Sequence, residues 1–136
     1  MSLSRIVAGA IAVICVAAAA AAGTEWEEDR LRINRLNAQD FEVMEDQDMS
    51  ARAFWCGAAS LIERREGRPG GTVIHLKRGR GPAIAGRGSS VVFTTDPTGL
   101  PRGVTALTVD VDRPGLALAA FQARGFCRDA FTRATK

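Results

Sequence analysis

The chain is poor in the residues on which most small catalytic or metal sites depend. Its 136 residues include one histidine, His75, no tyrosine and three cysteines. No cysteine lies close enough in sequence to another or to the histidine for zinc-ligand spacing, so we expect neither a metal nor another cofactor. We find no internal repeat and no sign of a second domain. These absences favour a small single domain that is not an enzyme.

The first 22 residues have the make-up of a secretory signal peptide. Met1–Arg5 carries one positive charge, residues 6–22 are apolar or small, and the run ends on three alanines. A basic start, an apolar middle and a small-residue end are typical of such signals. One alternative is an uncleaved membrane anchor, for which this alanine-rich run is slightly short. Another is lipidation at Cys15, which lacks the usual small residue before it.

Cleavage after Ala22 predicts a periplasmic or secreted protein that meets the membrane only through its signal peptide. The remaining 114 residues (136 − 22) suffice for one modest core. We divide them into an acidic stretch at 23–30, a single domain at 31–129 and a tail at 130–136.

Charge is distributed unevenly along the mature chain. Residues 23–48 hold nine acidic residues against three arginines, whereas residues 49–136 hold fourteen basic residues against six acidic ones. The two parts therefore carry opposite net charges, −6 and +8. The simplest consequence is that an acidic N-terminal segment lies against a basic body.

The patterns along 31–129 predict an α+β domain. Apolar and polar residues alternate in 31–34 and again in 41–45, and Asn37–Asp40 supplies turn chemistry between them. We therefore expect a short N-terminal hairpin.

A helix is predicted next, over residues 50–66. Asp48 or Ser50 is suited to cap its first amides, Gly67 is suited to end it, and Pro69 prevents its continuation. Its apolar residues recur at helical spacing and give one buried face.

Three more strands are expected at 72–77, 90–95 and 104–111. Asp96–Gly99 is typical of a tight turn, so we predict that the three strands form an antiparallel meander. A C-terminal helix is predicted over 118–127.

The two cysteines of the mature chain, Cys56 and Cys127, are expected to form a disulfide in an oxidising compartment. Trp55-Cys56-Gly57 also resembles the start of a thioredoxin-like redox site, but Ala59 stands where the second cysteine is needed. The competing hypothesis is a thiol-dependent enzyme or redox protein, with Cys56 as nucleophile and His75 as base.

Residues 77–88 form the most basic segment. Lys77, Arg78, Arg80 and Arg87 lie there among four glycines. The spacing imitates a phosphate-binding loop, but the final lysine and hydroxyl are replaced and a strand follows instead of a helix. We expect a mobile loop whose guanidinium groups and amides bind an anion, either an anionic envelope component or a protein partner. Nucleic acid is not expected, because no aromatic residues lie between the cations.

Six short motifs complete the pattern: Arg32-Ile33-Asn34-Arg35-Leu36-Asn37, Phe41-Glu42-Val43, Trp55-Cys56-Gly57-Ala58-Ala59, Arg78-Gly79-Arg80-Gly81-Pro82, Val92-Phe93-Thr94-Thr95 and Phe126-Cys127. With them the chain resembles a group of short exported bacterial proteins over about residues 32–127. The resemblance implies that Cys56 and Cys127 act as a pair, and it implies no activity or ligand.

Overall fold

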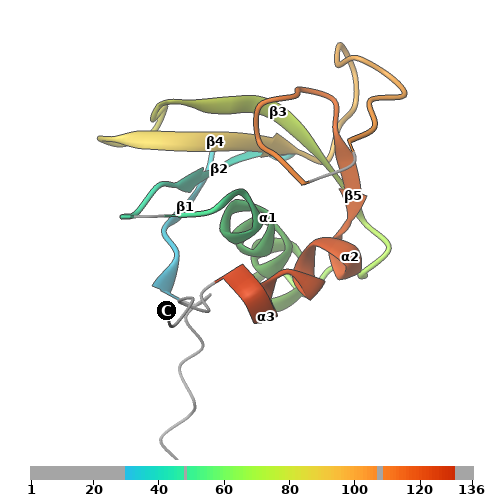
Figure 1. Ribbon diagram of the computed structural model, residues 1–136, viewed down its shortest axis with the longest axis horizontal. Coiled ribbons are helices and arrows are strands. Elements are labelled where there is room, and N and C mark those ends of the chain that lie inside the picture. Colours follow the sequence, from blue (N-terminus) through green and yellow to red (C-terminus); the bar gives the residue numbers. More distant parts are fainter. Residues whose placement is uncertain (1–29, 48, 107–108, 131–136) are drawn as a thin grey trace, which may run out of the picture.

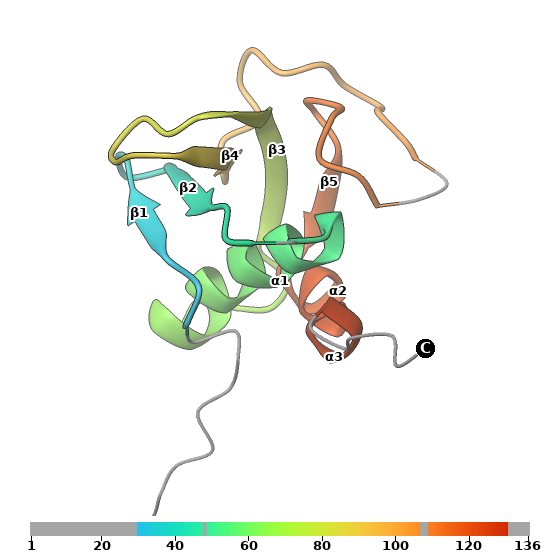
Figure 2. The ribbon, with the colours of Figure 1, turned by 60° about the vertical axis from the view of Figure 1, so that its left-hand side comes forward.

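The computed structural model describes residues 30–47, 49–106 and 109–130. A five-stranded antiparallel sheet in the order β1-β2-β4-β3-β5 carries all the helices on one face (Figures 1 and 2). The strands are β1 (Ile33–Arg35), β2 (Asp40–Met44), β3 (Val73–Pro82), β4 (Ser89–Thr94) and β5 (Ala117–Ala119), and the helices are α1 (Ala51–Ser60), its π-helical continuation η2 (Leu61–Arg65), α2 (Ala120–Gly125) and α3 (Cys127–Ala130). The α+β class is thus confirmed. The expected signal peptide, most of the acidic stretch and residues 131–136 lie outside the described residues.

The N-terminal hairpin is confirmed. β1 and β2 pair antiparallel, with Ile33 opposite Val43. The Asn37 side chain accepts the backbone N–H groups of Gln39 and Asp40 at 2.9 and 2.7 Å and so closes the turn.

The first helix spans almost the predicted residues. Ser50 is its N-cap and accepts the N–H of Ala53 at 3.2 Å. The chain leaves the helical end at Gly67, whose φ of 61° suits glycine.

The predicted three-stranded meander is wrong in its third strand. Residues 104–106 and 109–111 are not in a strand, although Val111 is fully buried and Val104, Ala106 and Val109 pack on the core. The turn at Asp96–Gly99 does form, with the Asp96 carboxylate accepting the N–H and the hydroxyl of Thr98. Both edges of β4 are already occupied, by β2 and by β3, so a strand following this turn cannot pair with β4.

The start of the predicted C-terminal helix is also wrong. Residues 117–119 form β5, which pairs with Val73–His75 at the free edge of β3, and α2 begins only at Ala120. The unpaired edge of β3 overrides the helical preference of this alanine-rich stretch, because it offers backbone partners to an extended chain.

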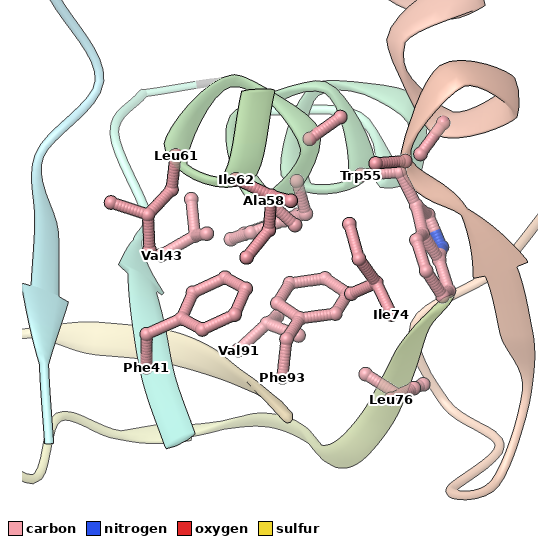
Figure 3. Packing of buried hydrophobic residues seen from close by; sticks show 14 of the residues in the cluster. Phe41, Val43, Trp55, Ala58, Leu61, Ile62, Ile74, Leu76, Val91 and Phe93 are labelled. Atoms are coloured by element: carbon pink, nitrogen blue, oxygen red, sulfur yellow. The ribbon is translucent and has the colours of Figure 1, made fainter. Parts of the chain in front are cut away.

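The core lies between α1 and the sheet (Figure 3). Phe93 of β4 is at its centre, stacked on Phe41 with 5.9 Å between ring centroids and meeting the edge of Trp55 at 4.9 Å. Trp55 is fully buried, and its indole N–H donates to the carbonyl oxygen of Asp110 at 3.0 Å. This bond and Val111 hold the segment after Asp96 against the core.

The disulfide between Cys56 and Cys127 is confirmed, with an S–S distance of 2.05 Å. It joins α1 to α3, as the sequence predicted for the first and last helices. α3 buries none of its own residues, and the bond attaches it covalently to α1.

Candidate functional site

The basic segment is mostly strand. β3 continues through Pro82, so only residues 83–88 form the connection to β4. We call these six residues the hairpin loop. It lies at the left of Figure 1, at the opposite end of the sheet from β5. Lys77 lies in a strand, as the predicted strand 72–77 has it, but the prediction that 78–82 belong to a mobile loop is wrong.

Two of the four predicted anion contacts form ion pairs with the protein itself. Lys77 Nζ lies 2.5 Å from the Asp40 carboxylate, and Arg80 Nε lies 3.2 Å from the Glu45 carboxylate. Arg80 also lies over the ring of Phe54, 5.2 Å from its centroid. Both cations are partly exposed, but each already faces an anion.

The Arg78 side chain forms hydrogen bonds within the β3–β4 hairpin. Its guanidinium donates to the carbonyl oxygens of Gly79, Gly81, Pro82 and Ser90 and to the Ser90 hydroxyl, at 2.7 to 3.4 Å. These bonds tie the end of β3 to the start of β4. Arg78 therefore shapes the hairpin that carries the loop.

Arg87 is the fourth predicted contact and differs from the others. It is exposed, and no hydrogen bond or ion pair joins it to another of the described residues. Ile84, in the same loop, is 61% exposed, as is Phe121 of α2 at the other end of the sheet. The hairpin loop thus presents one cation and one apolar group to solvent.

Glu42 of β2 is a site residue that the sequence analysis missed. It lies on the face of the sheet away from the helices, yet it is fully buried beneath the hairpin loop. Its carboxylate accepts the backbone N–H groups of Ile84 and Ala85, both at 2.8 Å, and the Ser90 hydroxyl at 2.7 Å. The Asn34 side chain adds a fourth hydrogen bond at 3.2 Å.

These contacts keep Glu42 ionised. Burial alone would raise the pKa of its carboxyl group, but the hydrogen bonds from Ile84, Ser90, Ala85 and Asn34 together lower it from 4.5 to about 2. Because Arg78 also donates to the Ser90 hydroxyl, a cation lies one hydroxyl group away from the buried anion. The backbone amides that we expected to bind an external anion are therefore occupied by an internal one.

Glycines in this segment have structural reasons unrelated to phosphate. A Cβ on Gly79 would lie 2.6 Å from the carbonyl oxygen of Val111, so glycine permits the close approach of that segment to β3. Gly88 closes the hairpin loop with a φ of 93°, and its carbonyl oxygen accepts the Ala83 N–H at 2.8 Å.

The expected charge complementarity is confirmed for residues 40–45. Their carboxylates neutralise β3: Asp40 pairs with Lys77, Glu45 pairs with Arg80, and Glu42 is linked to Arg78 through Ser90. As a result, Arg87 is the only cation of the predicted set that keeps an uncompensated charge within the described part of the chain.

The structure does not bring together the residues of the competing thiol hypothesis. Cys56 is fully buried on the helix side of the sheet and is bonded to Cys127. His75 pairs with Thr94 across the sheet. Its neighbours in β3, Ile74 and Leu76, are buried on the helix side, so the His75 side chain lies on the other face of the sheet. Burial lowers the pKa of His75, while the negative charge of Asp96 acts in the opposite direction.

Within 30–47, 49–106 and 109–130, no helix has both the length and the apolar character needed to cross a membrane. In the same residues, no group of three or more His, Cys, Asp or Glu side chains is placed to hold a metal ion.

The hairpin loop, held by Glu42 and presenting Ile84 and Arg87, is thus the candidate functional site. No family model, curated protein or solved structure matches the chain, so this site is assigned from its geometry alone.

Proposed function

We propose that the mature protein is a non-enzymatic binding domain of the cell envelope or the extracellular space, and that it binds an anionic partner through the hairpin loop. The observation that carries the proposal is the exposure of Arg87 and Ile84 on a loop whose backbone is fixed from below by a buried carboxylate. The four cations singled out in the sequence then have different roles, and only Arg87 is a direct contact.

The way the loop is held supports a recognition role. Burying a carboxylate is unfavourable unless hydrogen bonds replace its lost water. Here that carboxylate fixes the amides of Ile84 and Ala85, at the surface. A loop that is already ordered loses little conformational entropy on binding, which favours affinity.

The exposed groups indicate the chemistry of the partner. An arginine forms strong, geometrically defined hydrogen bonds with carboxylate, phosphate or sulfate groups. An isoleucine beside it adds apolar contact area. A partner with an anionic group next to an apolar surface therefore suits the hairpin loop.

Export is part of the proposal. The signal-like residues 1–22 and the disulfide between Cys56 and Cys127 both fit an oxidising compartment. The intact mass of the native protein tests this directly. We expect a mass starting at Gly23 or a near neighbour, two hydrogens lighter than the reduced form, and no uptake of an alkylating agent before reduction. A native protein that retains residues 1–22 or takes up label at both cysteines would contradict export with a disulfide.

Reversing the charge of Arg87 tests the binding site. Arg87→Glu is expected to weaken binding to dextran sulfate, a soluble polyanion, at least tenfold in low salt, because it replaces the exposed cation with an anion. Isothermal titration calorimetry at several salt concentrations measures the effect, and the wild-type affinity should fall as salt rises.

Arg102→Glu is the matched control. Arg102 is also exposed and has no ion pair with another described residue, but it lies in the segment between β4 and β5. The Arg102→Glu substitution changes the net charge by the same amount as Arg87→Glu. We expect it to alter the affinity for dextran sulfate less than twofold. Equal losses in the two variants would show that only the overall charge matters, and the hairpin loop would then not be the binding site.

A further inference from the structure

The hairpin loop has the features of a receptor for a carboxylate group. Three donors converge on the two oxygens of the Glu42 carboxylate. The backbone N–H of Ile84 and the Ser90 hydroxyl donate to Oε2 at 2.8 and 2.7 Å, and the backbone N–H of Ala85 donates to Oε1 at 2.8 Å. The side-chain amide of Asn34 completes the set at 3.2 Å and also donates to the Ala85 carbonyl oxygen at 3.0 Å. Converging backbone amides of this kind bind anions in many proteins.

Little else holds the loop in place. Its residues are Ala83, Ile84, Ala85, Gly86, Arg87 and Gly88, and the two large side chains among them point to solvent. The small side chains offer few apolar contacts to offset the entropy lost on ordering a loop. Apart from the Ala83–Gly88 backbone bond, the hydrogen bonds that order the loop go to Glu42 and Asn34.

We infer that residues 84–90 and Asn34 form a carboxylate-binding site whose resident ligand is the chain's own Glu42, and that this occupancy positions Ile84 and Arg87 for the partner. Glu42 is then a positioning residue, since it lies beneath the loop and touches no partner. The role in positioning depends on the proposed function, whereas the carboxylate site itself does not.

The site is tested by removing the Glu42 carboxylate from the chain and supplying a carboxylate as free acetate. In Glu42→Ala the alanine keeps Cβ, and acetate has the size and charge of the missing Cγ and carboxylate. We expect amide hydrogen exchange at Ile84 and Ala85 to accelerate at least tenfold in this variant, and the affinity for dextran sulfate to fall several-fold. Addition of about 100 mM acetate should reverse most of both changes, whereas chloride at equal ionic strength and neutral acetamide should not.

Two further variants show whether faster exchange in Glu42→Ala reflects a general loss of structure. Val43→Ala alters the neighbouring residue on the core face of β2, so it should destabilise the protein without speeding exchange at Ile84 and Ala85 relative to Val91 and Phe93. Glu42→Gln keeps the shape of the side chain but has one acceptor oxygen instead of two. If Glu42→Ala fails to fold, Glu42→Gln should still lose protection at one or both loop amides while the amides of β4 keep theirs.

The outcomes separate the two proposals. Unchanged loop protection in the Glu42 variants, or acetate acting no better than chloride and acetamide, would overturn the carboxylate site. Polyanion binding by the wild-type protein that does not depend on Arg87 would overturn the proposed function. In that case the amide-exchange comparison still decides whether the hairpin loop holds a carboxylate.

Discussion

Replacing both Cys56 and Cys127 by alanine is expected to lower the free energy of unfolding by about 4 kcal/mol. The bond closes a loop with a sequence separation of 71 residues, and its removal returns that much chain entropy to the unfolded state. A domain of this size has a total stability of about 5 to 10 kcal/mol, so the variant should be close to unfolding at 37 °C. Urea titration followed by tryptophan fluorescence, to which the buried Trp55 contributes, measures the loss.

Two comparisons test whether the loss comes from the bond itself. Reduction of the wild-type protein should produce the same decrease in stability as the double substitution, and reduction of the double variant should have no effect. Each single cysteine-to-alanine variant should lose nearly as much as the double variant, because either one removes the bond. Single losses that add up to the double loss would instead indicate that the two sites contribute by packing alone.

The fold also predicts which part of the molecule unfolds first when the disulfide is removed. The bond joins α3 to α1, and Arg52 of α1 forms a 3.6 Å ion pair with Asp129 of α3. The Arg52 guanidinium also lies 5.8 Å from the ring centroid of Phe126, the residue just before α3. The ion pair is largely exposed and contributes little. Without the disulfide, α3 should therefore separate from the body before the sheet and α1 unfold.

The sequence predicted the elements whose signals are local. The β1–β2 hairpin depends on alternation and on the Asn37 side chain, and α1 depends on a Ser50 cap and helical spacing. Both form within a short stretch of chain, so their patterns are complete in the sequence. The disulfide could be predicted for a different reason, since the expected cleavage after Ala22 leaves only two cysteines.

Strand pairing between distant segments could not be predicted in the same way. Alternation in 104–111 predicted one buried side, and Val111 of that side is buried. The alternation itself does not persist, because Thr105 of the same side is exposed whereas Ala106 of the other side packs on the core. It carried no information on backbone partners, because that depends on which sheet edges other strands have already filled. β5 has only three residues and gains its strand conformation from the edge of β3.

The candidate site was found only in outline for a related reason. A glutamate within an alternating strand is ordinarily read as exposed, and nothing in Phe41-Glu42-Val43 marks Glu42 as buried. The cover that buries it comes from residues more than forty positions later, 84 and 85. The opposite charges of 40–45 and 77–80 were the available signal, and they predicted an acidic segment against a basic one without giving the pairs.

Acid should destabilise the protein through Glu42, by about 3 kcal/mol. Its pKa is lowered from 4.5 to about 2 in the folded state, so the unfolded chain binds this proton more readily. The stabilisation is therefore complete above pH 4.5 and is lost progressively as the pH falls from 4.5 to about 2. A shift of this size corresponds to about 3 kcal/mol, since one pKa unit is about 1.4 kcal/mol.

Glu42→Gln isolates this contribution. Asp40 and Asp96 also have lowered pKa values. For Asp40, hydrogen bonds from Lys77, Thr94 and Asn37 outweigh the effect of burial, and for Asp96 the cause is its hydrogen bonds from Thr98. Both groups titrate in the variant as in the wild type, so they cancel in the difference between the two proteins.

We therefore expect the wild type to be more stable than Glu42→Gln at pH 6, and this stability difference to shrink by about 3 kcal/mol by pH 2. Urea titrations of both proteins at half-unit steps of pH measure it. A difference that stays constant over this range would mean that Glu42 does not carry its charge beneath the hairpin loop. Both the carboxylate site and the fixed geometry of Ile84 and Arg87 would then lose their physical basis.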